Sequence, residues 1–186
     1  MTFVPTDSQL GCGVDDQDWS CSTWPVNDRA EPVLTIRTAV LADLPALRRV
    51  FRTASLSNAG DAPMLLARPE FLMFAGDGIA EGRTRVAVAG RQDERLIVGF
   101  ATVFIGNDGP ELEDLFVDPV WRRRGIARRL VLDFVTTLQQ QGHRHLWVTG
   151  NPHASDFYLA IGFFGTGRVA TALGTGLRMY LDLTRT

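Results

Sequence analysis

The chain has 186 residues, of which 45% are hydrophobic and 22% charged, and its formal net charge is −2. This length and composition are those of one ordinary soluble globular domain. The near-neutral charge gives no overall attraction to nucleic acid or to an anionic membrane, and no apolar run is long enough to span a bilayer.

Residues 1–32 are polar, interrupted by Gly, Pro, Asp and Ser, and without lasting periodicity. They predict a poorly ordered or surface-packed extension, followed by a domain over residues 33–186. The N-terminus lacks the pattern of a signal peptide, so we expect a cytoplasmic location. Cys12 and Cys21 are then expected as free thiols. No metal site is expected, because no histidine or further cysteine lies near them at ligand spacing.

The first half of the domain predicts a strand, two helices and a β-hairpin. Asp43 precedes a helix that has Pro45 in its first turn and apolar residues on one face. A loop is expected before the second helix, which two glycines weaken. The expected elements are a strand at 33–37, a helix to residue 54, a loop at 55–68, a shorter helix at 69–80, and paired strands at 85–89 and 96–105.

Residues 111–130 predict a strand, a tight turn and the start of a long helix. Apolar residues lead to Pro119, which ends the strand because proline cannot donate to a sheet ladder. After Gly125, apolar residues recur at helical spacing from 127 to 138. Three arginines therefore lie at the helix start, where positive charge is unfavourable unless an anion binds. The alternatives are an anion site and a solvated basic helix start.

The last third predicts another strand, a short helix and two closing strands. Gly142 ends the long helix, and Asn151 followed by Pro152 has the residues of a helix start. The expected strands are 145–149, 163–169 and 177–183, with a helix from Asn151 to residue 160.

Two motifs resemble those of the GNAT superfamily of N-acetyltransferases. The run from Arg122 to Ala127 matches the family's Arg/Gln-x-x-Gly-x-Gly/Ala motif, directly after Leu115-Phe116-Val117-Asp118-Pro119. Asn151-Pro152-His153-Ala154, with Phe157-Tyr158 and Gly162-Phe163, resembles the second motif. The resemblance covers residue 33 to the C-terminus. It implies an α/β (α+β) GNAT-like acyl-CoA N-acyltransferase fold, with a mixed, mostly antiparallel sheet of six to seven strands and about four helices.

The resemblance implies acetyl-CoA as co-substrate. Its pyrophosphate would meet the backbone of residues 123–128, where Gly125 allows close approach and arginine side chains add charge-assisted bonds. Its pantetheine arm would lie along residues 115–117 like an added strand. The family separates this strand from the one ending at Thr149, and the thioester enters that gap. The expected binding residues are Leu115, Phe116, Val117, Arg122, Arg123, Arg124, Gly125, Ile126, Ala127, Arg128, Asn151 and Tyr158.

Tyr158 is the predicted general acid, because the family places a tyrosine here and a phenol can protonate a leaving thiolate. Glu113, and secondly Glu111, are candidate bases for the amine. Strand alternation puts these two carboxylates on one face and Asp114 on the other. A solvent-facing acidic strand edge is the alternative interpretation. His153 is a weaker candidate base.

The implied reaction is transfer of an acetyl group to a primary amine by direct attack in a ternary complex, without a metal. A non-catalytic acyl-CoA sensor, or an acyltransferase using a longer acyl-CoA, would share these motifs. A nucleic-acid-binding module is the third rival, and we expect neither nucleic acid nor a membrane as partner.

A small-molecule acceptor is favoured over a protein. Asp61, Glu70 and Asp77 could attract a cationic amine, although Arg68 opposes this. The sequence leaves a homodimer open.

Overall fold

The computed structural model describes residues 33–90 and 95–184. The predicted N-terminal extension and both cysteines lie outside these ranges. No helix within them is long and apolar enough to cross a membrane.

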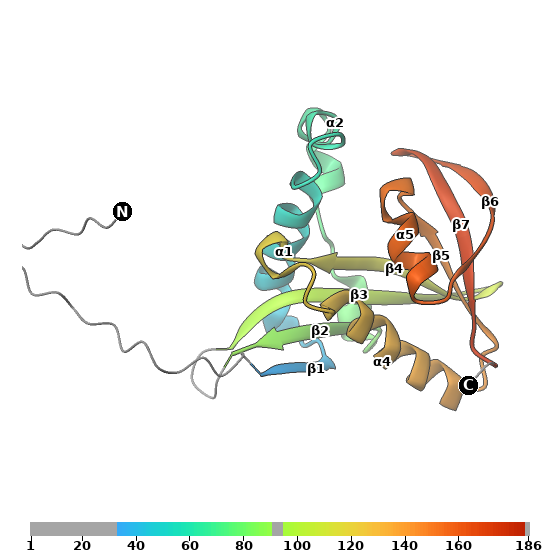
Figure 1. The fold of residues 1–186 in the computed structure, drawn as a ribbon. Helices are drawn as coiled ribbons and strands as arrows, with labels where there is room; N and C mark the ends of the chain where they lie inside the picture. The colour runs from blue at the N-terminus through green and yellow to red at the C-terminus, as the bar shows by residue number, and fades with distance from the viewer. Residues whose placement is uncertain (1–32, 91–94, 185–186) are drawn as a thin grey trace, which may run out of the picture. The chain divides into compact units, whose positions relative to one another are not determined.

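Seven strands form one sheet in the order β1-β2-β3-β4-β5-β7-β6 (Figure 1). Neighbouring strands are antiparallel except β4 and β5, which are parallel. The expected mixed, mostly antiparallel sheet is confirmed. The strands are β1 (Leu34–Thr38), β2 (Thr84–Ala89), β3 (Leu96–Gly106), β4 (Gly109–Val117), β5 (His145–Gly150), β6 (Phe164–Thr171) and β7 (Gly174–Asp182).

Five α-helices accompany the sheet, and the segment between the first helix and β2 differs from the prediction. The single helix expected over 69–80 is wrong, because Met73 is extended and Gly76 is left-handed with φ of +87°. The expected loop at 55–68 contains a short helix with a proline in its first turn. The helices are α1 (Leu44–Leu56), α2 (Ala62–Ala67), α3 (Asp77–Ala80), α4 (Ile126–Gln140) and α5 (Ser155–Ala160), with 3-10 turns at Leu41–Asp43, Pro69–Leu72, Pro119–Trp121 and Pro152–Ala154.

α4 and α1 cover opposite faces of the sheet (Figure 1). The apolar side of α4 buries Leu130, Val131 and Phe134, as its spacing predicts. α1 buries Leu47 and Val50 in a second apolar cluster on the other face. A sheet with an apolar cluster on each face positions the strand ends rigidly.

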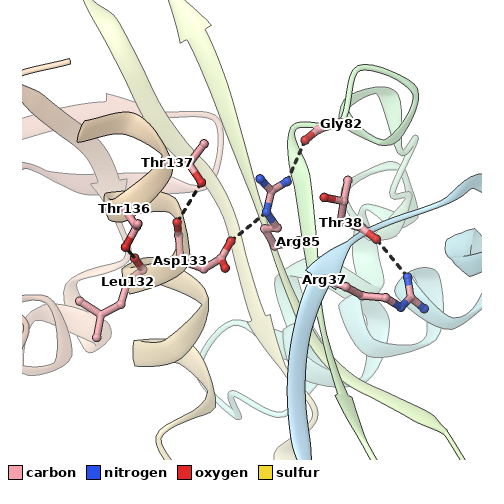
Figure 2. A network of polar contacts seen from close by, with 8 residues as sticks. All are labelled: Arg37, Thr38, Gly82, Arg85, Leu132, Asp133, Thr136 and Thr137. Atoms are coloured by element: carbon pink, nitrogen blue, oxygen red, sulfur yellow. Dashed lines mark hydrogen bonds and ion pairs between the residues drawn. The ribbon is translucent and has the colours of Figure 1, made fainter. Parts of the chain in front are cut away.

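One ion pair fastens α4 to β2. Figure 2 shows Asp133 of α4 directed toward Arg85 of β2, whose Nε donates to the Asp133 Oδ2 at 2.8 Å. The same guanidinium donates to the Gly82 carbonyl oxygen at 2.9 Å and lies 5.2 Å from the ring centroid of Phe134. These contacts fix the side of α4 that faces the outer strands.

A second ion pair ties the end of β4 to α1. Arg49 donates from Nη1 to Asp118 Oδ2 at 2.7 Å and from Nη2 to the Ile97 carbonyl oxygen at 2.8 Å. Asp118 is only 6% exposed and also accepts from the Val120 N–H at 3.2 Å. This carboxylate therefore holds the turn between β4 and α4 against α1 and β3.

We predict that Asp118→Asn lowers the free energy of unfolding by about 2 kcal/mol, because it leaves the Arg49 charge without its buried partner. Denaturant unfolding measures this change. Glu81→Gln is the matched control, since Glu81 pairs with Arg83 at the surface and its removal should change nothing measurable. Equal effects of the two substitutions would contradict the role assigned to Asp118.

Candidate active site

β4 and β5 pair only over a short stretch and then separate. The parallel register joins Glu111 with Trp147 and Leu112 with Val148, and no later pair is formed. Among the strands that the structure describes, residues 113–117 of β4 therefore have a partner on the β3 side only. Their other edge presents backbone N–H and C=O groups to the opening.

The start of α4 lies just beyond the end of β4. Arg123 and Gly125 are both left-handed, with φ of +64° and +74°. The first bond from a helical N–H to the carbonyl four residues earlier runs from Arg129 to Gly125 at 3.0 Å. The N–H groups of residues 126–128 precede that bond, so they lack such a partner. Backbone donors at a helix N-terminus form a site for an anion.

The arginine side chains at this helix start differ in their contacts. Arg122 donates from Nη2 to Ser57 Oγ at 2.5 Å and to the Ala54 carbonyl oxygen at 3.4 Å, so it secures the end of α1. The Arg124 guanidinium lies 4.8 Å from the ring centroid of Trp121. Backbone donors are therefore the part of the predicted anion site that is already arranged.

Asn151 links the end of β5 to the connection between α1 and α2. Its Oδ1 accepts from the His153 N–H at 3.0 Å, which confirms the predicted cap. Its Nδ2 donates to Asp61 Oδ2 at 3.0 Å. Because both polar atoms of the side chain have protein partners, a contact with a pantetheine arm stays a prediction.

Tyr158 lies on the other side of the opening from β4. Its ring covers Gly150, where an added Cβ would come within 2.6 Å of Tyr158 Cε2. The ring also packs against Phe163, with centroids 5.4 Å apart. Burial raises the pKa of the Tyr158 phenol to about 12. Within the described residues no fully buried side-chain oxygen or nitrogen lacks a partner, so the hydroxyl is bonded or reaches solvent.

A β-bulge in β4 changes the faces of the acidic residues. Asp114 is opposite Thr102 and Leu112 is opposite Val103, so Glu113 is the extra residue. Glu111 pairs with Phe104, which lies on the same face of β3 as Thr102. Glu111 therefore shares its face with Asp114, and the alternation predicted from the sequence is wrong at this point.

The three carboxylates of β4 have different surroundings. Glu111 Oε1 accepts from Arg178 and, at 2.9 Å, from Thr149 Oγ1, so its charge is already paired. Glu113 is exposed at the bulge. Asp114 is mostly enclosed, and burial raises its pKa to about 6; a hydrogen bond from Thr102 opposes this shift and the charge of Glu113 adds to it. Asp114 is thus the one of the three poised to exchange a proton near neutral pH.

Asp114 was not among the predicted site residues, because regular strand alternation would place it on the face opposite Glu111 and Glu113. The acidic run Glu111-Leu112-Glu113-Asp114 showed that carboxylates gather here, but a bulge has no reliable sequence signal in this run. A second feature not predicted from the sequence is a pocket of about 300 Å³ beside the end of β5. Asp61, Thr149, Gly150, Asn151, Thr171 and Gly176 are among its lining residues.

Comparison with protein families and solved structures gives consistent results. The profile of an acetyltransferase (GNAT) domain matches residues 75–179, which is more than half of the chain. PaiA N-acetyltransferase from Thermoplasma acidophilum, solved with coenzyme A, superposes with a TM-score of 0.65 at 18% identity, covering 81% of this chain and 99% of that chain. A comparison with curated proteins finds no match.

Two further solved structures share the fold. The ribosomal-protein-S18-alanine N-acetyltransferase from Escherichia coli has a TM-score of 0.55 at 20% identity, with 81% of this chain and 94% of that chain covered. A Bacillus anthracis protein described as a streptothricin acetyltransferase, solved with acetyl coenzyme A, has a TM-score of 0.58 at 16% identity, with 81% and 98% covered. At these identities the likeness shows the fold, and the GNAT-like architecture expected from the sequence is confirmed.

We predict that Asp114→Asn stabilises the protein more at about pH 8 than at about pH 4. The pKa of Asp114 is raised to about 6 in the folded state, so the native state holds this proton more tightly than the unfolded state. Stability that is present below about pH 4 is therefore lost as the pH rises through 6. Asparagine does not ionise, so it removes this loss. The gain in the free energy of unfolding from Asp114→Asn should therefore be about 1 to 3 kcal/mol larger at pH 8 than at pH 4.

Thermal unfolding at the two pH values measures the effect. Asp108→Asn, in the exposed turn between β3 and β4, is the control and should shift stability little at either pH. If Asp114→Asn changed the stability by the same amount at both pH values, the ionisation of Asp114 would not be coupled to folding.

Proposed function

This chain belongs to the GNAT acetyltransferase family and is an N-acetyltransferase, and we propose that it acetylates a small-molecule primary amine. The amine would attack acetyl-CoA directly within a ternary complex. The observation that carries the proposal is the opening between β4 and β5, with backbone donors of α4 beyond one strand and Tyr158 beside the other.

The residues present fit the donor. The N–H groups at the start of α4, helped by the left-handed backbone at Arg123 and Gly125, would hold the pyrophosphate. The free edge of β4 at Leu115, Phe116 and Val117 would bond the pantetheine arm as an added strand does. Bound acetyl-CoA supplies an activated acetyl group and a thiolate leaving group. Of the arginines, Arg123 and Arg128 are exposed and able to reach an anion without breaking a contact to α1.

Tyr158 is proposed to stabilise the leaving sulfur. A phenol with a pKa of about 12 stays protonated at neutral pH, so it remains a hydrogen-bond donor throughout the reaction. Because thiols are stronger acids than this phenol, complete proton transfer to sulfur would be uphill. Hydrogen bonding to the developing thiolate is therefore its main contribution, with the proton following from the phenol or from water.

Asp114 is proposed as the proton acceptor for the incoming ammonium group, in preference to Glu113 and Glu111. Its raised pKa matches that of a base that works near neutral pH. Asp114 also lies on the same face of β4 as Glu111, and Glu111 contacts Thr149, which lines the pocket. Glu111 is held by Arg178, and proton uptake there would break an ion pair. Glu113, the base favoured by the sequence, is exposed and stays the alternative.

A small acceptor is supported by the pocket beside Gly150. Its volume of about 300 Å³ is at the lower end for small-molecule sites, and it lies at the end of β5 that borders the opening. A non-catalytic acyl-CoA sensor would keep the donor-binding features but would not need a protonated phenol or a buried carboxylate at the opening. An acyltransferase with a longer donor is distinguished by its acyl-CoA preference.

We expect acetyl-CoA at about a hundred times its Kd to stabilise the folded chain by about 2.7 kcal/mol, measured as a rise in Tm. With an amine substrate, Tyr158→Phe should lower kcat about 100-fold or more and leave the Tm rise with acetyl-CoA intact. Tyr180→Phe is the matched control, since the chain has two tyrosines and Tyr180 lies in an aromatic group on β7. The absence of any stabilisation by acetyl-CoA would overturn the donor assignment.

Asp114→Asn should lower kcat/KM at neutral pH about 100-fold and remove the limb of the pH–rate profile near pH 6. Rates of thiol release over a pH series measure both effects. Asp108→Asn serves again as control and should keep the wild-type profile. If Glu113→Gln removes the limb and Asp114→Asn does not, Glu113 is the base.

A further inference from the structure

The pocket at the end of β5 contains one carboxylate, and that carboxylate is held in place. Among the described residues that line the pocket, Asp61 is the only acidic one, and His153 is the only other ionisable one. Asp61 Oδ2 accepts from Asn58 Nδ2 at 2.6 Å and from Asn151 Nδ2 at 3.0 Å. Two amide donors on one carboxylate oxygen fix the orientation of the Asp61 side chain.

The two amides that hold Asp61 are themselves anchored. Asn151 Oδ1 accepts from the His153 N–H, and Asn58 Oδ1 accepts from the Gly60 N–H, each at 3.0 Å. The carboxylate therefore bridges the connection between α1 and α2 and the end of β5. Each element that it joins borders the pocket, so the group is positioned by the fold as well as by its own side-chain rotamer.

Asp61 has no cationic partner in the part of the chain that the structure describes. Among residues 33–90 and 95–184, no arginine or histidine forms an ion pair with it, and its Oδ1 accepts no hydrogen bond. By contrast, Asp43, Glu111, Asp118 and Asp133 are each paired with an arginine. A fixed carboxylate in a pocket, with one oxygen free, is arranged to bind a cation from outside the chain.

We propose that the acceptor is a small diamine, whose second ammonium group binds Asp61 while its first attacks the thioester. This deepens the proposed function and rests on it. Thr149 and Gly150 line the same pocket and mark the end of β5 at the opening, so the pocket extends from Asp61 to the place where the acetyl group is expected. The hydroxyl groups of Thr171 and Thr175, which also line it, suit a polar ligand. The Asp61 carboxylate favours an acceptor that has a second positive charge at its far end.

The test compares acceptors of equal length that differ only at the far end. Wild-type protein is assayed by thiol release with acetyl-CoA and 1,4-diaminobutane, 4-amino-1-butanol or n-pentylamine, and with the shorter and longer diamines. We expect kcat/KM for the best diamine to exceed that of its matched amino alcohol about 10- to 100-fold. Asp61→Asn, which keeps a hydrogen-bond acceptor for both amides, should abolish this preference through KM. Its effect on kcat/KM for the amino alcohol should be much smaller, because that acceptor has no second ammonium group.

Two variants complete the experiment. Asp156→Asn, on the exposed side of α5 outside the pocket, should keep the wild-type preference. Asp61→Glu should restore part of the preference that Asp61→Asn loses, which a folding defect would not allow. Equal kcat/KM for diamine and amino alcohol in wild type, or a preference that survives in Asp61→Asn, would overturn the proposal. Failure of the proposed function is recognised separately, because acetyl-CoA would then not raise Tm.

Discussion

The separation of β4 from β5 is the constraint on which the rest of the structure depends. A parallel pair joined by only two residue pairs leaves a row of backbone groups on β4 without a strand partner. Beside this point Arg178, Glu111 and Thr149 connect β7, β4 and β5 through side chains, and the Arg178 guanidinium lies 4.9 Å from the ring centroid of Trp147. The strands are thus held together at one place and can open beyond it without losing their register.

The two faces of the sheet surround the opening with different side chains. On the α4 face, Tyr158 belongs to the main apolar cluster, and burial there keeps its phenol protonated. On the α1 face, Asp114 and Glu111 lie beside the opening with polar neighbours. α1 is connected to both ligand regions, because Arg122 bonds its C-terminal end and Asn58, just beyond it, holds Asp61.

Sequence patterns predicted the elements whose signals are local and repeated. The apolar spacing of α4, the cap formed by Asn151 and a mixed sheet of six to seven strands were expected, and all three are confirmed. The helix expected over 69–80 was wrong, because a left-handed Gly76 and an extended Met73 interrupt it. The bulge at Glu113 was not foreseen, since one extra residue in β4 is defined by its pairing with β3 and not by its own sequence.

The sequence by itself predicted the family, which is confirmed, and it indicated the start of α4 and Tyr158 as candidate site residues, because each depends on a short run of residues. Tertiary structure alone decided which carboxylates are available. Glu111 forms an ion pair with Arg178, which is 67 positions away in the sequence. Burial raises the pKa of Asp114, and Asp61 accepts a hydrogen bond from Asn151, which is 90 positions away. Such assignments depend on distances between strands and loops, which a linear pattern does not contain. The physical reason is that charge pairing and desolvation are set by neighbours in space.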